Sequence, residues 1–379
     1  MRSYATGSLV DVFGEYVVYR SLVPADRRLP TIHDLRERLG LGAGILPRKA
    51  QTDYANVVGA ILIEARRISG IAGKAAYLIY VGDTIHNDVA AFSNLCREME
   101  WEGRAFIADE CSEASKDVQW LADDQQLTQS NQWDDIASFK ECIADEGFGC
   151  DSSTIVVVDI DKTLLGARGR NDRVIDQARQ QAAYEVARDA LGATLVLWDK
   201  FAEIYDNVNS PALHVLTEDN QDAVAYTSLL VSCGLLDLVS LRAAVDNGDI
   251  VGIQGLVNDV EQRRGLLTPG IVRLHDDVRE QVLAGNPTPF VAFRQAEFRC
   301  TARLMGHLPE DASRDSILDE EIAITEEVWT VLKAWKAKGC LVFGLSDKPD
   351  EACYPPGAPS DSQALPLHAL RTHIVGGRR

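Results

Sequence analysis

The chain has 379 residues, of which 46% are hydrophobic, so it is long and apolar enough to bury a sizeable core in one or two domains. Acidic residues outnumber basic residues 57 to 38, which gives a formal charge of -19. Because this charge repels nucleic acid and anionic lipid, we expect neither as a partner. Acidic residues also interrupt the first segment where a secretory signal needs apolar ones, and no stretch is apolar over a bilayer's thickness, so the sequence predicts a cytoplasmic protein.

Short apolar runs rich in β-branched residues predict strands that are buried on both faces of a parallel sheet. A helical pattern at about 88–99 lies between the apolar runs at 75–84 and 103–110. Alternating strands and helices predict an α/β fold with a Rossmann-like, doubly wound parallel sheet. In chain order, we expect strands at 75–84, 103–110, 154–163, 339–348 and 372–377, of which the second and the last have the weaker patterns.

The segment from about 170 to 317 has no comparable strand pattern and is expected to be helical. Its first part places small apolar residues four positions apart, at Val174, Ala178, Ala182, Val186 and Ala190. Further helical patterns lie near 222–247, 251–264 and 316–338. We therefore predict three parts: residues 1–165 as the first part of an α/β core, 166–317 as a large helical cap, and 318–379 as the remainder of the core.

The eight cysteines and seven histidines are scattered along the chain. No pair of cysteines has the spacing of a zinc site, and no nucleophile with a histidine base is visible. The candidate chemistry therefore lies in the carboxylates.

Two carboxylates, Asp159 and Asp161, follow the apolar run at 154–158 in the sequence VVVDIDKT. Placing charge where a buried strand ends is unfavourable unless the charge has a use. There one carboxylate can attack while the other handles protons. The alternative is a strand-end cap without catalytic function.

A second cluster follows the run at 75–82, where Gly82 and Asp83 precede Asn87 and Asp88 in VGDTIHND. Gly82 permits a tight turn, and the two carboxylates offer oxygen ligands of the kind that Mg²⁺ accepts. Asp88 alone can also be explained as a helix N-cap.

The third cluster, GLSDKPD, offers the hydroxyl of Ser346 and the ammonium of Lys348 immediately after a strand. Both can bind phosphate, although such residues are also common in turns.

Together these three clusters resemble the motifs of the haloacid dehalogenase superfamily. The first motif of that family, DxDxT, is matched by Asp159, Asp161 and Thr163. The second, a Ser or Thr at a strand end, is matched by Ser346, and the fourth, GDxxxND, by Gly82, Asp83, Asn87 and Asp88. The third, a lysine upstream of the fourth, is best matched by Lys49.

The order of the motifs departs from the family, because this chain runs Lys49, Asp83, Asp159, Ser346. The resemblance therefore implies a circular permutation, with the usual chain cut between the second and third motifs. In the family, the strands that carry the first and fourth motifs are neighbours, so the permuted chain is expected to rebuild the same site. The resemblance covers about 45–165 and 318–377, and the remainder corresponds to a cap inserted between the first and second motifs.

The resemblance implies a Mg²⁺-dependent phosphatase in which Asp159 attacks phosphorus and forms an aspartyl-phosphate. Asp161 serves as the acid and base. Thr163, Gly82 and Asn87 take structural roles near the site. Mg²⁺ is expected to be bound by Asp159, Asp83 and the main-chain carbonyl of Asp161, with Asp88 in support. Ser346 and a lysine, either Lys49, which we prefer, or Lys348, are expected to bind the phosphate.

A phosphomutase or phosphotransferase using the same residues remains an alternative, as does a non-catalytic binding protein that kept the fold. The expected substrate is a small phosphorylated metabolite, because the acidic surface disfavours polymers. The sequence leaves the oligomeric state open. Four arginines, at 168, 170, 294 and 299, can contact anionic groups of a substrate, but we interpret them as solvated surface residues.

Overall fold

The computed structural model describes residues 4–42, 44, 46–192, 196–218, 220–357 and 365–377. The chain divides into two compact units, and each is described by itself. The core unit comprises Met1–Ile175, Leu304–Cys353 and Leu365–Arg379, and the helical unit comprises Asp176–Arg303 and Tyr354–Ala364. The predicted cap, 166–317, contains the longer segment of the helical unit and extends beyond it at both ends. Within the described residues, no helix combines the length and the apolar character needed to cross a membrane.

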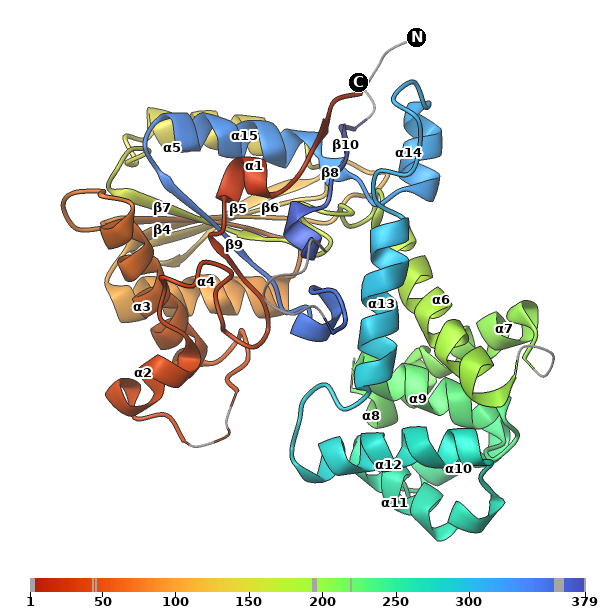
Figure 1. The fold of residues 1–379 in the computed structure, drawn as a ribbon. Helices are drawn as coiled ribbons and strands as arrows, with labels where there is room; N and C mark the ends of the chain where they lie inside the picture. The colour runs from red at the N-terminus through yellow and green to blue at the C-terminus, as the bar shows by residue number, and fades with distance from the viewer. Residues whose placement is uncertain are drawn as a thin grey trace. The chain divides into compact units, whose positions relative to one another are not determined.

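The core unit is built on a seven-stranded sheet (Figure 1). All neighbouring strands are parallel except the edge strand β5, which is antiparallel to β6. In spatial order the strands are β2 (Val17–Val18), β9 (Leu341–Leu345), β7 (Thr154–Asp159), β3 (Tyr77–Gly82), β4 (Glu102–Ala108), β6 (Gln125–Ser130) and β5 (Lys116–Ala122).

Helices cover both faces of this sheet (Figure 1). On one face lie α2 (Ile32–Leu39), α3 (Thr52–Ile68) and α4 (Ile85–Met99). On the other lie α1 (Val10–Phe13), α5 (Asp135–Asp145) and α15 (Glu326–Ala337). The predicted α/β class is therefore confirmed, with a mostly parallel sheet between two helical layers.

The central strands form because their side chains are apolar on both faces. Every residue of β7 is buried, and β3 is buried from Leu78 onward. Their side chains pack against α3 and α4 through residues such as Val58, Leu62 and Phe92. The predicted strands at 75–84, 103–110, 154–163 and 339–348 correspond to β3, β4, β7 and β9.

Some elements differ from the prediction. The expected strand at 372–377 forms as β10 (Thr372–Val375), but it belongs to a separate small sheet, with β1 (Thr6–Gly7) on one side and β8 (Ile324–Thr325) on the other. The β5–β6 hairpin has no counterpart in the sequence prediction, because β5 is exposed throughout and has no apolar run. The expected helical pattern at 316–338 is divided by β8 into α14 (Arg314–Glu320) and α15.

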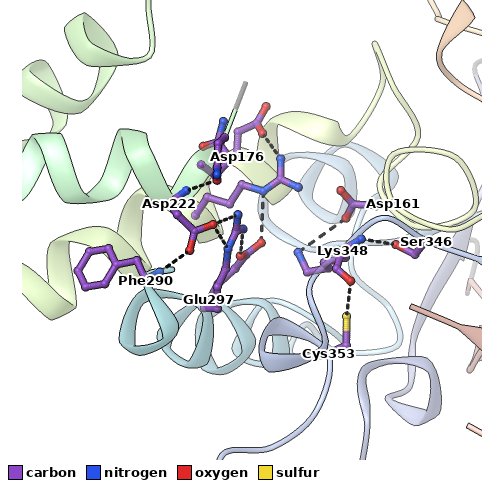
Figure 2. Close-up of polar contacts among 12 residues, drawn as sticks. Asp161, Asp176, Asp222, Phe290, Glu297, Ser346, Lys348 and Cys353 are labelled. Atoms are coloured by element: carbon purple, nitrogen blue, oxygen red, sulfur yellow. Dashed lines mark hydrogen bonds and ion pairs between the residues drawn. The ribbon is translucent and has the colours of Figure 1, made fainter. Parts of the chain in front are cut away.

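The helical unit contains no strand among its described residues. Its helices are α6 (Asp172–Leu191), which begins in the core unit, α7 (Trp198–Val208), α8 (His214–Thr217), α9 (Gln221–Ser232), α10 (Leu238–Asp246), α11 (Gly252–Gln262), α12 (Pro269–Leu283) and α13 (Val291–Arg303). In its interior, Arg294 donates hydrogen bonds to Asp222 and Glu297 (Figure 2). All three side chains are buried, so this arginine is a structural part of the unit and its interpretation as a surface residue was wrong.

Candidate active site

The candidate site lies at the carboxyl edge of the sheet, where three neighbouring parallel strands end together. Asp159 is the last residue of β7 and is opposite Leu345, the last residue of β9. On the other side, β3 is the parallel neighbour of β7, and Asp83 follows it. Ser346 follows β9. The strand ends therefore bring together residues from three distant parts of the chain.

Lys49 links two of the carboxylates that the sequence singled out. Its Nζ donates to Oδ1 of Asp159 at 2.6 Å and to Oδ1 of Asp88 at 2.6 Å. The side chain is only 4% exposed. Burial alone would lower the pKa of Lys49, but the charges of Asp159 and Asp88 outweigh it and hold this pKa well above its usual value. Lys49 is therefore a buried ammonium ion shared by two carboxylates.

Asp88 accepts hydrogen bonds at both of its oxygens. Oδ1 accepts from Lys49 and from the hydroxyl of Tyr80, and Oδ2 accepts from the main-chain N–H of Asp83 and from both donors of Thr84. Burial raises the pKa of Asp88, but the charge of Lys49 and these hydrogen bonds lower it overall. Thr84, not Asp88, is the N-cap of α4. Asp88 instead satisfies the N–H groups at the start of this helix from within its first turn.

Gly82 is needed here for space. A Cβ atom at this position would lie 2.6 Å from Cγ of Asp88. Gly82 is not among the residues with positive φ, so the tight turn expected from the sequence does not explain it. The glycine is explained by the close approach of the strand to the Asp88 carboxylate.

Asp83 is paired with an arginine. Nε of Arg168 donates to its Oδ2 at 2.5 Å. Burial and the nearby charge of Asp88 raise the pKa of Asp83 to about 6, although Arg168 opposes this shift.

Asp83, Asp88 and Asp159 form a buried group that suits a metal ion. One oxygen of each lies within 4.8 Å of the others, and no other such group occurs in the described part of the chain. Burial and the charges of its neighbours raise the pKa of Asp159 well above its usual value, although Lys49 opposes the shift. A hard divalent cation prefers carboxylate oxygens and would offset this crowding of negative charge.

The chain turns sharply after β7 and so places Asp161 beside Asp159. Lys162 lies at the turn with φ of 66°, a left-handed conformation that is uncommon for a residue other than glycine. The hydroxyl of Thr163 donates to Oδ2 of Asp159 at 3.2 Å, and its carbonyl accepts from Thr325. The hydroxyl of Thr163 therefore helps to orient the carboxylate of Asp159.

Ser346, Lys348 and Asp161 lie together beside this turn (Figure 2). The main-chain N–H of Lys348 donates to the hydroxyl of Ser346 at 3.1 Å. Nζ of Lys348 lies 3.8 Å from Oδ1 of Asp161, which is a longer ion pair than either of those made by Lys49. Asp350, two residues after Lys348, accepts two hydrogen bonds from Ser21.

Not every residue singled out in the sequence belongs to this site. Asn87 is exposed and makes no hydrogen bond with the cluster in the described structure. The side chain of Arg170 is only 4% exposed and donates to Glu110 and Glu327, so its interpretation as a surface residue was wrong. Arg299 is exposed, as expected.

Three residues of the site were missed. Tyr80 and Thr84 donate to Asp88, and Arg168, which we interpreted as a solvated residue, binds Asp83. Thr84 lies directly after Asp83, so the hydroxyl next to the motif was a usable signal. The sequence around Arg168 gave no such signal, because its partner Asp83 is 85 positions away.

No family model, curated protein or solved structure matched this chain.

Proposed function

We propose that this protein is a Mg²⁺-dependent phosphohydrolase of the haloacid dehalogenase type, in which Asp159 is the nucleophile. The observation that carries this proposal is the buried ammonium of Lys49, which lies between Asp159 and Asp88 inside a group of three carboxylates. A lone strand-end cap requires neither a buried cation nor two further carboxylates. A site that must bind both a metal ion and a phosphate group requires all of them.

The arrangement of the strands supports the proposed permutation. β7, which carries the first motif, is a direct parallel neighbour of β3, which carries the fourth. β9, which carries the second, is its neighbour on the other side. Because the site is formed by strand ends that meet in space, the order of these strands along the chain does not matter to the chemistry.

In the first step, an oxygen of Asp159 attacks phosphorus, and the bond from phosphorus to the leaving oxygen breaks. Asp161 donates a proton to that oxygen as it leaves. In the second step, Asp161 takes a proton from water, which attacks the phosphorus of the aspartyl-phosphate. The bond to Asp159 then breaks and releases inorganic phosphate. Thr163 keeps Asp159 aligned through both steps.

The positive groups of the site have separate tasks in this scheme. Lys49 stabilises the anionic nucleophile and the charge of the transferring phosphoryl group. Ser346 and Lys348 offer donors on the β9 side, where Lys348 also lies next to the proton-carrying Asp161. Mg²⁺, held by Asp83, Asp159 and the main-chain carbonyl of Asp161 with Asp88 in support, would offset the repulsion between nucleophile and substrate.

We further propose that the substrate is a small phosphorylated metabolite. The formal charge of -19 disfavours a polyanionic polymer.

The proposal is tested by measuring Mg²⁺-dependent release of 4-nitrophenol from 4-nitrophenyl phosphate. Asp159→Asn should remove turnover and leave the unfolding transition cooperative, because it removes one charge and retains the side-chain volume. Asp145→Asn, an equal change on the exposed end of α5, should retain wild-type turnover. Most of the wild-type rate in folded Asp159→Asn protein would exclude Asp159 as the nucleophile, and a wild-type rate that is unchanged by Mg²⁺ removal would exclude the metal-dependent reaction.

A further inference from the structure

Arg168 lies at the boundary between the candidate metal site and a cavity of about 580 Å³ in the core unit. Its guanidinium is held at Nε by Oδ2 of Asp83. The other guanidinium nitrogens of Arg168 donate no hydrogen bond to any residue that the structure describes. The guanidinium of Arg168 therefore binds one carboxylate oxygen of Asp83, which is a candidate metal ligand.

The main chain of Arg168 is fixed, whereas its side chain has room to move. Its N–H donates to the carbonyl of Lys162 at 2.7 Å, and its own carbonyl accepts from Glu110 at 3.1 Å and from Nε1 of Trp133 at 3.1 Å. The side chain is 31% exposed and lines the cavity. Any change in its partner must therefore be a rotation of the side chain around a fixed Cα.

The cavity offers Arg168 a second carboxylate. Asp109, which follows β4, lines it together with Arg168 and Asp83. The carboxylate of Asp109 is exposed and accepts no hydrogen bond from the described residues. Burial disfavours the charged guanidinium, but Asp83 and, less strongly, Asp109 raise the pKa of Arg168. Asp109 thus offers the side chain a second negative charge on the wall of the same cavity.

We propose that Arg168 is a displaceable competitor for the metal site, which binds Asp83 when no divalent cation is present and moves to Asp109 when one binds. This inference rests on the metal site of the proposed function and adds its regulation. A divalent cation beside Asp83 repels the guanidinium, because like charges separated by a few ångströms in a half-buried site interact strongly. The exposed ion pair of Arg168 with Asp109 is weaker than its ion pair with Asp83. Moving Arg168 from Asp83 to Asp109 therefore costs free energy and lowers the affinity of the site for the divalent cation.

The experiment is a titration of the purified full-length protein with Mn²⁺, in which unbound Mn²⁺ is measured by electron paramagnetic resonance and Mg²⁺ is added as a competitor. Arg168→Gln should bind Mn²⁺ roughly tenfold more tightly than the wild type, which corresponds to about 1.4 kcal/mol. Lys162→Gln removes the same charge from the same turn, where the ammonium of Lys162 pairs with Asp172, and it should have a smaller effect.

A double-mutant cycle separates movement from simple charge effects. Asp109→Asn should weaken Mn²⁺ binding about threefold in the wild-type background and much less in the Arg168→Gln background. If both charges stayed in place, the effects of the two substitutions on the free energy of Mn²⁺ binding would add. A smaller effect of Asp109→Asn in the Arg168→Gln background therefore indicates that Arg168 changes its partner. Asp117→Asn, which removes an equal charge from the wall of the same cavity, should show no coupling to Arg168.

The outcomes are distinct. Weaker Mn²⁺ binding by Arg168→Gln, or an equal effect of Asp109→Asn in both backgrounds, would refute the switch and leave the metal site in place. Absence of Mn²⁺ binding by the wild type would refute the metal site itself, and with it the proposed function.

Discussion

Replacing Lys49 with Met should reduce both the stability and the activity of the protein, and the structure allows both effects to be estimated. Lys49 compensates two buried carboxylates at 2.6 Å each. Removing one partner of a buried ion pair typically costs about 3–5 kcal/mol, because the remaining charge is left uncompensated. We therefore expect a loss of this order in the free energy of unfolding of the metal-free protein. Mg²⁺ should restore part of it, since it supplies positive charge to the same carboxylates.

The effect on turnover should be larger for Lys49→Met than for Lys348→Met. Removing one fixed donor from a transferring anionic group typically lowers the rate about 10²- to 10³-fold. Lys49 contacts Asp159, the proposed nucleophile, directly, whereas Lys348 lies 3.8 Å from Asp161. The two lysines are nearly equally buried, at 4% and 5% exposure, so the pair of variants is well matched.

The assay combines initial rates of aryl phosphate hydrolysis with urea unfolding in the presence and absence of Mg²⁺. The expected result is that Lys348→Met retains more activity and that Mg²⁺ stabilises Lys49→Met more than it stabilises the wild type. If Lys348→Met is the less active variant, Lys49 is not the lysine that serves the phosphate. If Mg²⁺ stabilises the wild type and Lys49→Met equally, Lys49 and the metal ion do not act on the same carboxylates.

Two further changes test other parts of the core unit. Gly82→Ala places a Cβ atom 2.6 Å from Cγ of Asp88, so it should weaken Mn²⁺ binding and lower the free energy of unfolding by about 1–3 kcal/mol. Unchanged Mn²⁺ affinity would show that the position of Asp88 is unimportant for metal binding. A hydrogen bond with Glu327, together with burial, raises the pKa of Asp134 to about 6, so this group stabilises the folded state fully below about pH 4 and its contribution is lost as the pH rises through 6. Asp134→Asn keeps a donor to Glu327 without the charge, so it should raise the melting temperature more at pH 8 than at pH 5. Glu141→Gln, on the exposed side of α5, should not show this difference. An equal shift of the melting temperature at both pH values would contradict the raised pKa of Asp134.

The strands that carry the candidate site could be predicted from the sequence because they are buried on both faces. The four inner positions of β7, 155–158, all carry apolar side chains, so the run of valines before Asp159 is visible without any knowledge of its neighbours. β5 is the opposite case, since all its residues are exposed and its partner β6 lies only a short turn away. Its formation depends on pairing with the sheet edge, which leaves no periodic pattern in the sequence.

The pairing of charges could be predicted only in part. Asp83, Asp88 and Asp159 were recognisable because each lies at the end of an apolar strand or in the first turn of the helix that follows one. Arg168 and Arg294 were interpreted as solvated because a charged residue without a visible partner is usually exposed. Both have partners that only the fold brings near, and for Arg294 the partner Asp222 is 72 positions away.

The geometry of this site does not depend on the order of its strands along the chain. Lys49, Asp83, Asp159 and Ser346 come from four separate segments, and no two of them depend on a local turn to meet. Their distances are set by parallel strand neighbours, with β3 and β9 on either side of β7. What cannot be rearranged is the short turn after β7, where Asp161 and Thr163 must follow Asp159 directly and Lys162 adopts a left-handed conformation. A circular permutation that cut the chain within this turn should therefore abolish turnover of 4-nitrophenyl phosphate. A permutation that cut the chain at the exposed start of β5 should not. Activity in the variant cut within the turn would show that the turn does not align the nucleophile.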